Sequence, residues 1–154
     1  MTIYVLAVLI GIIAGLRSIT APAAASWAAT LGWLKVHGTP AAFLANPWTP
    51  YVLTVLAVGE LINDKLPRTP SRKMAGPFIG RIFTGALSGA AIGATGGEWM
   101  FGAGAGAVGA VIGTLGGAAA RARLTVAFGK DLSAALLEDL VAVGGAFAIV
   151  HSFS

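Results

Sequence analysis

RIFTGALSGAAIGATGGEWMFGAGAGAVGAVIGTLGGAAA, residues 81–120, is the stretch that decides the fold. It is apolar, and its glycines recur mostly at four-residue spacing. Residues four apart share one face of a helix, and glycine on that face lets two backbones approach closely. We therefore predict two helices that pack tightly on each other or on a second copy of the chain, and the alternative is a glycine-lined pore. The predicted packing glycines are Gly85, Gly89, Gly93, Gly97, Gly109, Gly113 and Gly117, with Gly102 and Gly106 as a further pair.

The composition around this stretch extends the same character to all 154 residues. Hydrophobic residues make up 56% of the chain and charged residues 10%, whereas a soluble domain has about 25% charged residues. This excludes a soluble domain, a disordered chain and a coiled coil. The absence of cysteine excludes disulfides, thiolate metal sites and a cysteine nucleophile. We predict one all-α transmembrane domain over residues 1–154, with the lipid bilayer as its partner and no nucleic acid.

Six apolar segments predict a polytopic helical bundle. A spanning helix needs about 20 apolar residues, a length that the last three segments reach and the first three do not. We therefore expect five or six short or broken transmembrane segments. The first two form either a tight hairpin of two short spans or one long broken helix, with Pro22 in the first turn of the new helix and Ser18 or Thr20 near its cap. The segments are Ile3–Leu16, Ala21–Leu34, Pro50–Asp64, Pro77–Thr95, Trp99–Ala120 and Leu132–Ser152.

Two basic clusters predict the orientation. Lys65, Arg68, Arg72 and Lys73 lie in a proline-containing loop, and Arg121, Arg123 and Lys130 follow two segments later. The positive-inside rule places both clusters in the cytoplasm. In a bacterial inner membrane, the loop at about 65–76 is then cytoplasmic and the C-terminus is outside. The N-terminus is outside if the first two segments both cross, and inside if they count as one.

Charged residues inside the apolar segments are the candidate functional groups. An ionisable group at membrane depth costs about 2.5–3.5 kcal/mol on insertion scales and marks function by default. The alternative is an internal ion-pair network that orders the bundle. The pairs we predict are Arg17 with Glu60 and Arg81 with Glu138; the pair Glu138-Asp139 lies in the last segment. The candidates for a substrate path are Arg17, Ser18, Thr20, Glu60, Asn63, Asp64, Arg81, Thr84 and Glu138.

Hydroxyl groups and histidines give weaker signals. Thr84, Ser88 and Thr95 follow Arg81 along one stripe that could line a wet path, or they could bond to their own helix backbone. His37 and His151 are isolated and lack the spacing of metal ligands. No catalytic motif is present, so we predict no metal, no cofactor and no enzymatic activity.

A short internal echo favours a repeat. Arg17-Ser18-Ile19-Thr20-Ala21 and Arg81-Ile82-Phe83-Thr84-Gly85 share the pattern Arg-x-x-Thr-small. Three segments precede the basic loop and three follow it, which is the 3+3 inverted-repeat plan common in transporters. The alternative is a chance match of five residues.

The stretch Gly59-Glu60-Leu61-Ile62-Asn63-Asp64-Lys65-Leu66-Pro67 resembles a family of small bacterial membrane proteins, domain of unknown function 4126. Members carry a similar Glu-x-x-x-Asp-Lys-x-Pro stretch, then a basic loop and a Gly/Ala-rich helix. Their first helix ends much like residues 15–22. Arg17 departs from the neutral amide of many members. The resemblance implies the membrane architecture and adds weight to Glu60, Asp64 and Lys65, but it implies no activity.

Together these features favour a small transporter or channel-like protein. Its site would lie where Arg17, Glu60, Arg81 and Glu138 converge. Helix N-termini and arginine attract negative charge, which indicates an anion or an anionic lipid headgroup as substrate. One chain of 154 residues offers little room for a complete path, so we expect a homodimer or higher homo-oligomer. The alternatives are a non-enzymatic membrane scaffold or assembly protein and a lipid-modifying membrane enzyme.

Overall fold

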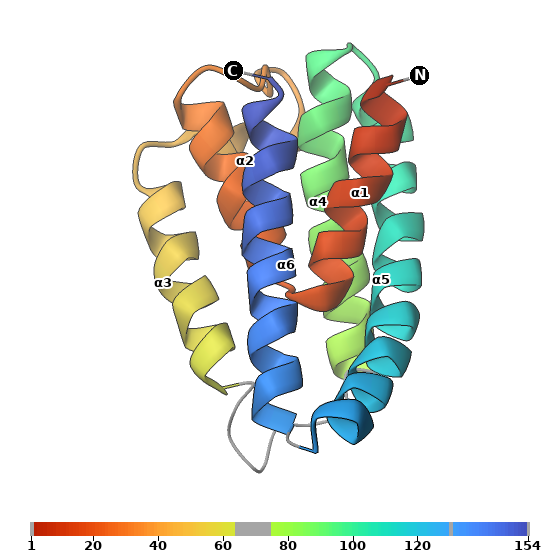
Figure 1. Ribbon diagram of the computed structural model, residues 1–154. Helices are drawn as coiled ribbons and strands as arrows, with labels where there is room; N and C mark the ends of the chain where they lie inside the picture. The colour runs from red at the N-terminus through yellow and green to blue at the C-terminus, as the bar shows by residue number, and fades with distance from the viewer. Residues whose placement is uncertain (1, 64–74, 130, 154) are drawn as a thin grey trace.

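A computed structural model describes residues 2–63, 75–129 and 131–153, and these residues form an all-α bundle (Figure 1). The described part contains six α-helices, one 3-10 helix and no strand. The predicted all-α class is therefore confirmed. The elements are α1 (Thr2–Leu16), α2 (Thr20–Thr30), η1 (Pro40–Ala45), α3 (Thr49–Asn63), α4 (Ala75–Thr95), α5 (Trp99–Phe128) and α6 (Asp131–His151).

Each predicted segment corresponds to one α-helix, but α5 is longer than predicted. It continues two turns past Ala120 to Phe128. Arginine and alanine are good helix formers, so the basic cluster does not end the helix. The helix ends at Gly129, whose φ of 70° is in the left-handed region that terminates helices. Arg121 and Arg123 thus lie on α5, and Lys130 lies outside the described residues, as does most of the predicted cytoplasmic loop.

Within the described residues, two helices are long and apolar enough to cross a membrane. The qualifying stretches are Phe78–Thr95 in α4 and Trp99–Ala127 in α5. The 21 residues of α4 correspond to roughly 31 Å, close to the hydrocarbon thickness of about 30 Å. The predicted bundle of five or six spans is not shown by this criterion, because α1, α2 and α3 are too short to meet it.

The first two helices form a hairpin that turns back inside the bundle (Figure 1). α1 and α2 contain 15 and 11 residues, or roughly 22 and 16 Å. The ends of α1 and α2 meet at residues 17–19, partway along the longer helices, and both chain termini lie at the same end of the bundle. Pro22 explains the position of the break, since in a continuous helix its ring would collide with the carbonyl of Ser18.

Glycines hold α4 and α5 in backbone contact. A Cβ atom added at Gly89 would collide with the carbonyl oxygen of Gly102, and one added at Gly93 would lie 2.8 Å from the Gly102 Cα. A Cβ at Gly85 would lie 2.8 Å from the Gly106 carbonyl oxygen. The two glycine rows therefore pack on each other within one chain, which is one of the two arrangements predicted.

The same face of α5 also receives α1. Cβ atoms at Gly109 and Gly113 would collide with the backbone of α1, at Val8 and Ile12 respectively. Gly117 is buried on the same helix. The prediction for Gly97 is wrong: α4 ends at Thr95, and Gly97 lies exposed in the turn with φ 81° and nothing near its Cβ position. Its role is to reverse the chain, which a left-handed backbone allows.

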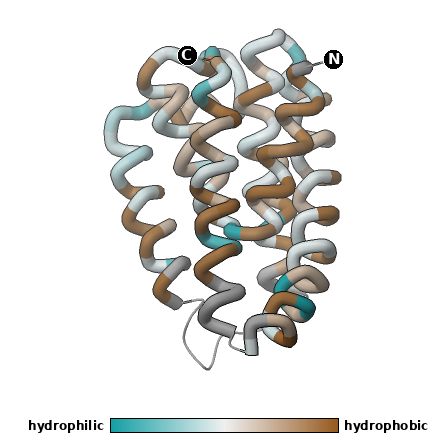
Figure 2. Tube along the Cα trace, in the orientation of Figure 1, coloured by the Kyte–Doolittle hydropathy of each residue, from teal (hydrophilic) through white to brown (hydrophobic). Residues whose placement is uncertain are grey.

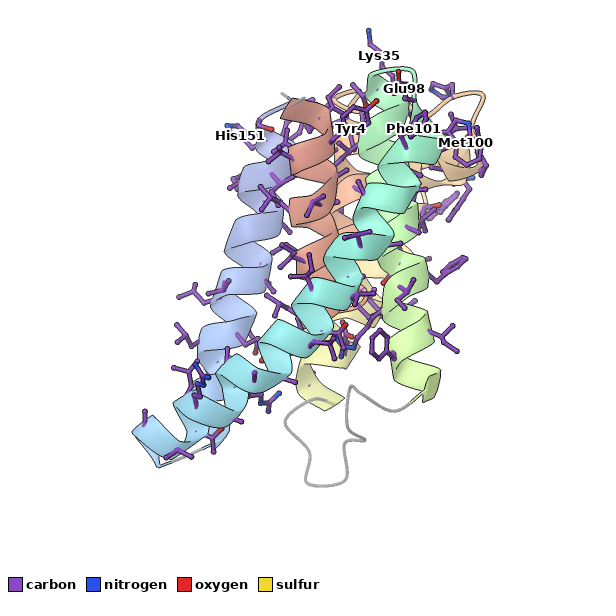
Figure 3. All side chains as sticks on the ribbon, turned by 90° about the vertical axis from the view of Figure 1, so that its right-hand side faces the viewer. Tyr4, Lys35, Glu98, Met100, Phe101 and His151 are labelled. Carbon is purple, nitrogen blue, oxygen red and sulfur yellow. The ribbon has the colours of Figure 1, made fainter. Side chains whose placement is uncertain are left out.

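Hydrophobic residues occur along most of the length of the helices (Figure 2), and many of the large ones are exposed on the outside of the bundle. Figure 3 shows polar groups at the end that carries the termini, where Lys35, Glu98 and His151 lie. Between the ends, large hydrophobic side chains are exposed on every α-helix except α2, which is mostly buried. Examples are Leu9, Val55, Ile79, Phe83, Phe101, Ile112, Leu140 and Phe147.

α3 is the most peripheral helix. It packs mainly on α2 and on η1, and most of its side chains are exposed. At the end near η1, the indole N–H of Trp27 donates to Thr54 Oγ1 at 2.8 Å, and the rings of Trp27 and Tyr51 meet edge to face. Farther along α3, its polar contact with the rest of the bundle is made through Glu60.

Candidate functional site

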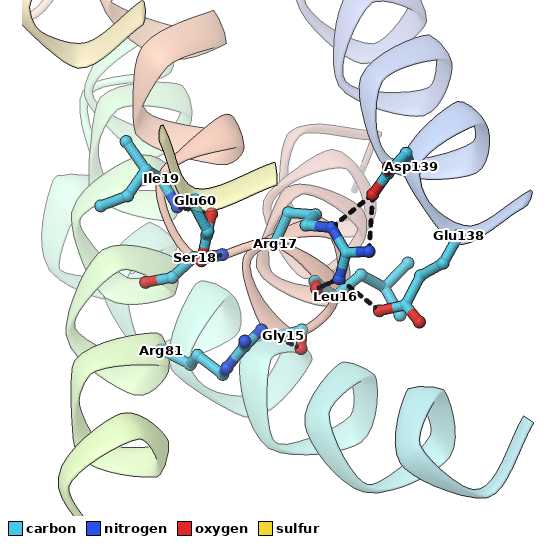
Figure 4. Close-up of polar contacts among 9 residues, drawn as sticks. All are labelled: Gly15, Leu16, Arg17, Ser18, Ile19, Glu60, Arg81, Glu138 and Asp139. Atoms are coloured by element: carbon cyan, nitrogen blue, oxygen red, sulfur yellow. Dashed lines mark hydrogen bonds and ion pairs between the residues drawn. The ribbon is translucent and has the colours of Figure 1, made fainter. Parts of the chain in front are cut away.

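The candidate site surrounds the break between α1 and α2 (Figure 4). A helix that ends inside a bundle leaves carbonyl groups unsatisfied at its C-terminus and N–H groups unsatisfied at its N-terminus. Both kinds of group occur here within residues 15–19. Charged side chains from α3, α4 and α6 reach them, so the site is a meeting point of five helices.

Arg17 connects the break to α6. Its side chain is completely buried, and its Nη1 lies 2.8 Å from Glu138 Oε1. Its Nε donates to Asp139 Oδ1 at 2.7 Å, and Nη1 also donates to the carbonyl oxygen of Leu16 at 2.8 Å. The guanidinium group is thus held by two carboxylates and by the last turn of its own helix. Such a charge-assisted arrangement fixes the hairpin against α6.

Glu60 caps the start of α2 from the neighbouring helix α3. The backbone N–H of Ser18 donates to Glu60 Oε2 and that of Ile19 donates to Oε1, each at 2.9 Å. Ile19 is the N-cap residue of α2, and no side chain caps the helix at this residue. The carboxylate therefore acts from α3 like the Glu of a capping box, which accepts from the backbone N–H of the N-cap residue. Its negative charge also faces the positive end of the α2 dipole.

Arg81 caps the end of α1 from α4. Its Nη1 donates to the carbonyl oxygen of Gly15 at 2.7 Å, and the residue is 9% exposed. A cation at a helix C-terminus interacts favourably with the dipole. The two ends of the broken helix thus receive charges of the appropriate sign, a carboxylate at the N–H groups and a guanidinium group at a carbonyl.

Most hydroxyl groups near the site bond to the backbone of their own helices. This is the alternative to lining a wet path. Thr84 donates to the Arg81 carbonyl at 3.1 Å, and Ser88 donates to the Thr84 carbonyl at 2.7 Å. Thr95 similarly bonds to the carbonyl of Ala91. Thr84 also lies 3.2 Å from the hydroxyl of Ser18, which joins α4 to the break.

Two hydroxyl groups differ from these. Thr20 Oγ1, at the first residue of α2, is buried and has no hydrogen-bond partner among the described residues. The same holds for Thr114 Oγ1 on α5, whose backbone faces Gly15. Buried polar atoms in proteins normally have a partner, so both hydroxyl groups are candidates for a bond to a ligand or a water molecule.

A cavity of about 150 Å³ lies beside Glu138 between α1, α5 and α6. It extends from the end of α1 toward the basic end of α5. It is partly open to the outside of the bundle, and its accessible lining is apolar. The lining residues are Leu16, Gly117, Ala120, Arg121, Leu124, Leu137, Glu138 and Val141.

The structure corrects the predicted charge pairs. Arg17 pairs with Glu138 and not with Glu60, while Glu60 binds backbone N–H groups. Arg81 donates to the carbonyl oxygen of Gly15, and its predicted pairing with Glu138 stays a prediction. The pairing of Arg17 with Asp139 was missed, although the adjacency of Asp139 to Glu138 was the available signal. The predicted convergence of Arg17, Glu60, Arg81 and Glu138 around the hairpin is seen in Figure 4.

Other predicted site residues lie elsewhere or beyond description. Asn63 is the last residue of α3, and its side chain lies outside the described residues, as does all of Asp64. Ser18 and Thr20 lie at the start of α2, but neither side chain caps it. Among the described residues no group of three or more His, Asp or Glu side chains could hold a metal ion.

The chain matches no protein-family model, no curated protein and no solved structure at a significant level. The resemblance to domain of unknown function 4126 therefore stays a prediction. The function must be argued from the site itself.

Proposed function

We propose that this protein is a small membrane transporter that moves an anion past the break between α1 and α2. The observation that carries the proposal is the α1–α2 hairpin, whose turn lies inside the bundle and has charged side chains at both helix ends. Discontinuous helices in transporters bind anionic groups at their half-helix N-termini. Here the N-terminus of α2 holds the carboxylate of Glu60, so its geometry suits an oxyanion.

The apolar outward faces support a location within a bilayer. Monomeric soluble proteins rarely expose such a continuous apolar surface. On this proposal α3, α4, α5 and α6 cross the membrane, and the α1–α2 hairpin enters and leaves on one side. Irregular backbone at membrane depth is tolerated where protein buries it, which suits the buried residues at the break. In a bacterial inner membrane, the end with Arg121 and Arg123 would face the cytoplasm and both termini would lie outside.

The buried polar groups near the break support a transport role over a purely structural one. The site offers unsatisfied hydroxyl groups at Thr20 and Thr114 and a cavity beside Glu138. An ion-pair network that served only to order the bundle would need neither. The cavity extends the site toward the basic end of α5, which supports that side as the cytoplasmic access.

Two copies of the chain would complete the path. The glycine rows are used within one chain, so they no longer argue for a dimer. The argument that stays is the small size of one subunit, in which the pocket beside Glu138 measures about 150 Å³. A homodimer would enclose a longer path.

Anion flux into proteoliposomes tests the proposal. Purified protein would be reconstituted, and uptake of formate, acetate, chloride and phosphate would be measured against protein-free vesicles. Ser18→Leu places a bulky side chain at the break and should abolish flux. Ser152→Leu changes an exposed serine at the end of the bundle and should leave flux unchanged.

The outcomes separate the candidate functions. Loss of flux in Ser18→Leu and unchanged flux in Ser152→Leu would support the transporter, provided that both variants elute as folded protein. Folded wild-type protein without flux of any tested anion contradicts the proposal and favours a scaffold. Turnover of a lipid by the purified protein would favour an enzyme. Equal flux in Ser18→Leu and wild type would place the path away from the break.

A further inference from the structure

We propose that Glu60 is a tethered occupant of a carboxylate-binding subsite, and that a small substrate carboxylate displaces it. The subsite consists of the backbone N–H groups of Ser18 and Ile19 with the hydroxyl of Thr20. This inference rests on the proposed transport function for its role in the cell, and it names the class of substrate.

The two N–H groups bind a carboxylate as a pair. Each donates to a different oxygen of Glu60 at 2.9 Å, so the carboxylate bridges both donors. Figure 4 shows Glu60 reaching them from α3, a separate helix. Because the bound group is a carboxylate on a flexible side chain, any small carboxylate of similar shape presents the same two oxygens to the same two donors.

Thr20 supplies an independent indication of a ligand. Its residue is 7% exposed, and Oγ1 has no hydrogen-bond partner among the described residues. It is the first residue of α2, and a helical Cα–Cβ bond tilts toward the helix N-terminus. Its Cβ atom is thus displaced toward the helix end that carries the two N–H donors. A free carboxylate is not tethered to α3, so one of its two oxygens could also accept a hydrogen bond from this hydroxyl group.

The position of α3 makes the exchange mechanically feasible. α3 packs mainly on α2 and η1, and Glu60 makes its polar contact with the break. Release of the Glu60 carboxylate would therefore break few other contacts. The Trp27–Thr54 hydrogen bond at the η1 end would still hold the helix, so α3 could tilt outward about that end.

Glu60→Ala tests the inference by chemical rescue. Removal of the carboxylate leaves the two N–H groups unsatisfied and a gap of carboxylate size. We expect a lower melting temperature in detergent and its saturable recovery with sodium acetate or formate, but not with sodium chloride at equal ionic strength. Labelled acetate should bind to Glu60→Ala with a stoichiometry of one per chain and at least about tenfold more tightly than to the wild type. In the wild type the Glu60 side chain is a tethered competitor, whose effective concentration lies in the millimolar range.

The controls make each outcome decisive. Glu98→Ala removes an exposed glutamate and should show no acetate dependence. Glu60→Asp keeps a carboxylate one methylene too short to reach both donors, and it should show the tighter acetate binding even if Glu60→Ala does not fold. Absence of acetate-dependent stabilisation and binding in the folded Glu60 variants overturns the inference. Acetate binding without vesicle flux would support the subsite and contradict the transport function. Flux without acetate binding to the variants would support the transport function and contradict the subsite.

Discussion

Arg17 and Glu138 lie 121 residues apart in the chain and 2.8 Å apart in the structure. The arginine is completely buried, and the side chain of the glutamate is 7% exposed. Removal of one partner of a buried ion pair is strongly destabilising because the remaining charge stays buried, whereas removal of both partners is much less so. This contact therefore couples the tip of the hairpin to α6.

We expect Arg17→Gln and Glu138→Gln each to lower the free energy of unfolding by about 3–5 kcal/mol. The double variant should lose clearly less than the sum of the two. Thermal or denaturant unfolding in detergent measures the cycle, and a cycle of Arg17→Gln with Glu98→Gln serves as the additive reference. Additivity of Arg17 and Glu138 within error would show that the contact carries no energy.

Glycine packing predicts opposite outcomes at two nearby positions on α5. A Cβ at Gly106 would collide with the Gly85 carbonyl oxygen, whereas nothing lies within 4 Å of the Cβ position of Gly104. Gly106→Ala should therefore destabilise the protein, and Gly104→Ala should stabilise it by roughly 0.5–1 kcal/mol through helix propensity. Melting temperatures of the two variants and the wild type in detergent would test both expectations. Similar values for the two variants would mean that α4 and α5 can separate without cost.

Arg81 should contribute stability through the carbonyl of Gly15. Arg81→Met leaves that buried acceptor unsatisfied, at an expected cost of about 1–3 kcal/mol. Arg81→Lys keeps a positive donor and should recover part of the loss. Unfolding of both variants in detergent gives the comparison. If Arg81→Lys is no more stable than Arg81→Met, the guanidinium group acts only by its shape.

The hairpin predicts that both termini lie on one side of the membrane. Single cysteines at Lys35 and Ser152 should be labelled by an impermeant reagent from outside, and one at Ala122 only after the cytoplasmic side is exposed. The chain has no native cysteine, so no background arises. A fluorescent tag at the N-terminus should report the same side as Lys35. Labelling of Lys35 and Ser152 from opposite sides would contradict the arrangement of helices.

The sequence predicted the helices and their contacts well where spacing alone decides them. The four-residue glycine spacing determines which face of α4 meets α5, and the prediction extended wrongly only to Gly97, because periodicity does not reveal that the helix has ended at Thr95. Apolar length predicts an end at Ala120, before the basic cluster, whereas α5 continues to Phe128 because arginine and alanine favour helices.

The charge partners could not be predicted from the sequence. Residue numbers give depth along a helix but not its rotation about the neighbours, so Arg17 could equally have faced Glu60 or Glu138. The partners of Glu60 are backbone N–H groups, which belong to no sequence motif. The usable signal was Pro22, because a proline four residues after Ser18 exposes backbone groups that a buried polar side chain must satisfy.

The long separation between Arg17 and its carboxylates has a consequence for biogenesis. At a synthesis rate of about 5–20 residues per second, Glu138 leaves the peptidyl-transferase centre roughly 6 to 25 s after Arg17. During that interval the hairpin lacks the partners that neutralise its buried guanidinium group. The hairpin is thus translated well before the helix that completes its environment. In the membrane location proposed above, the hairpin would wait at the headgroup interface or within the insertion machinery until α6 arrives, and a nascent chain that stops before α6 should be recognised as unfinished.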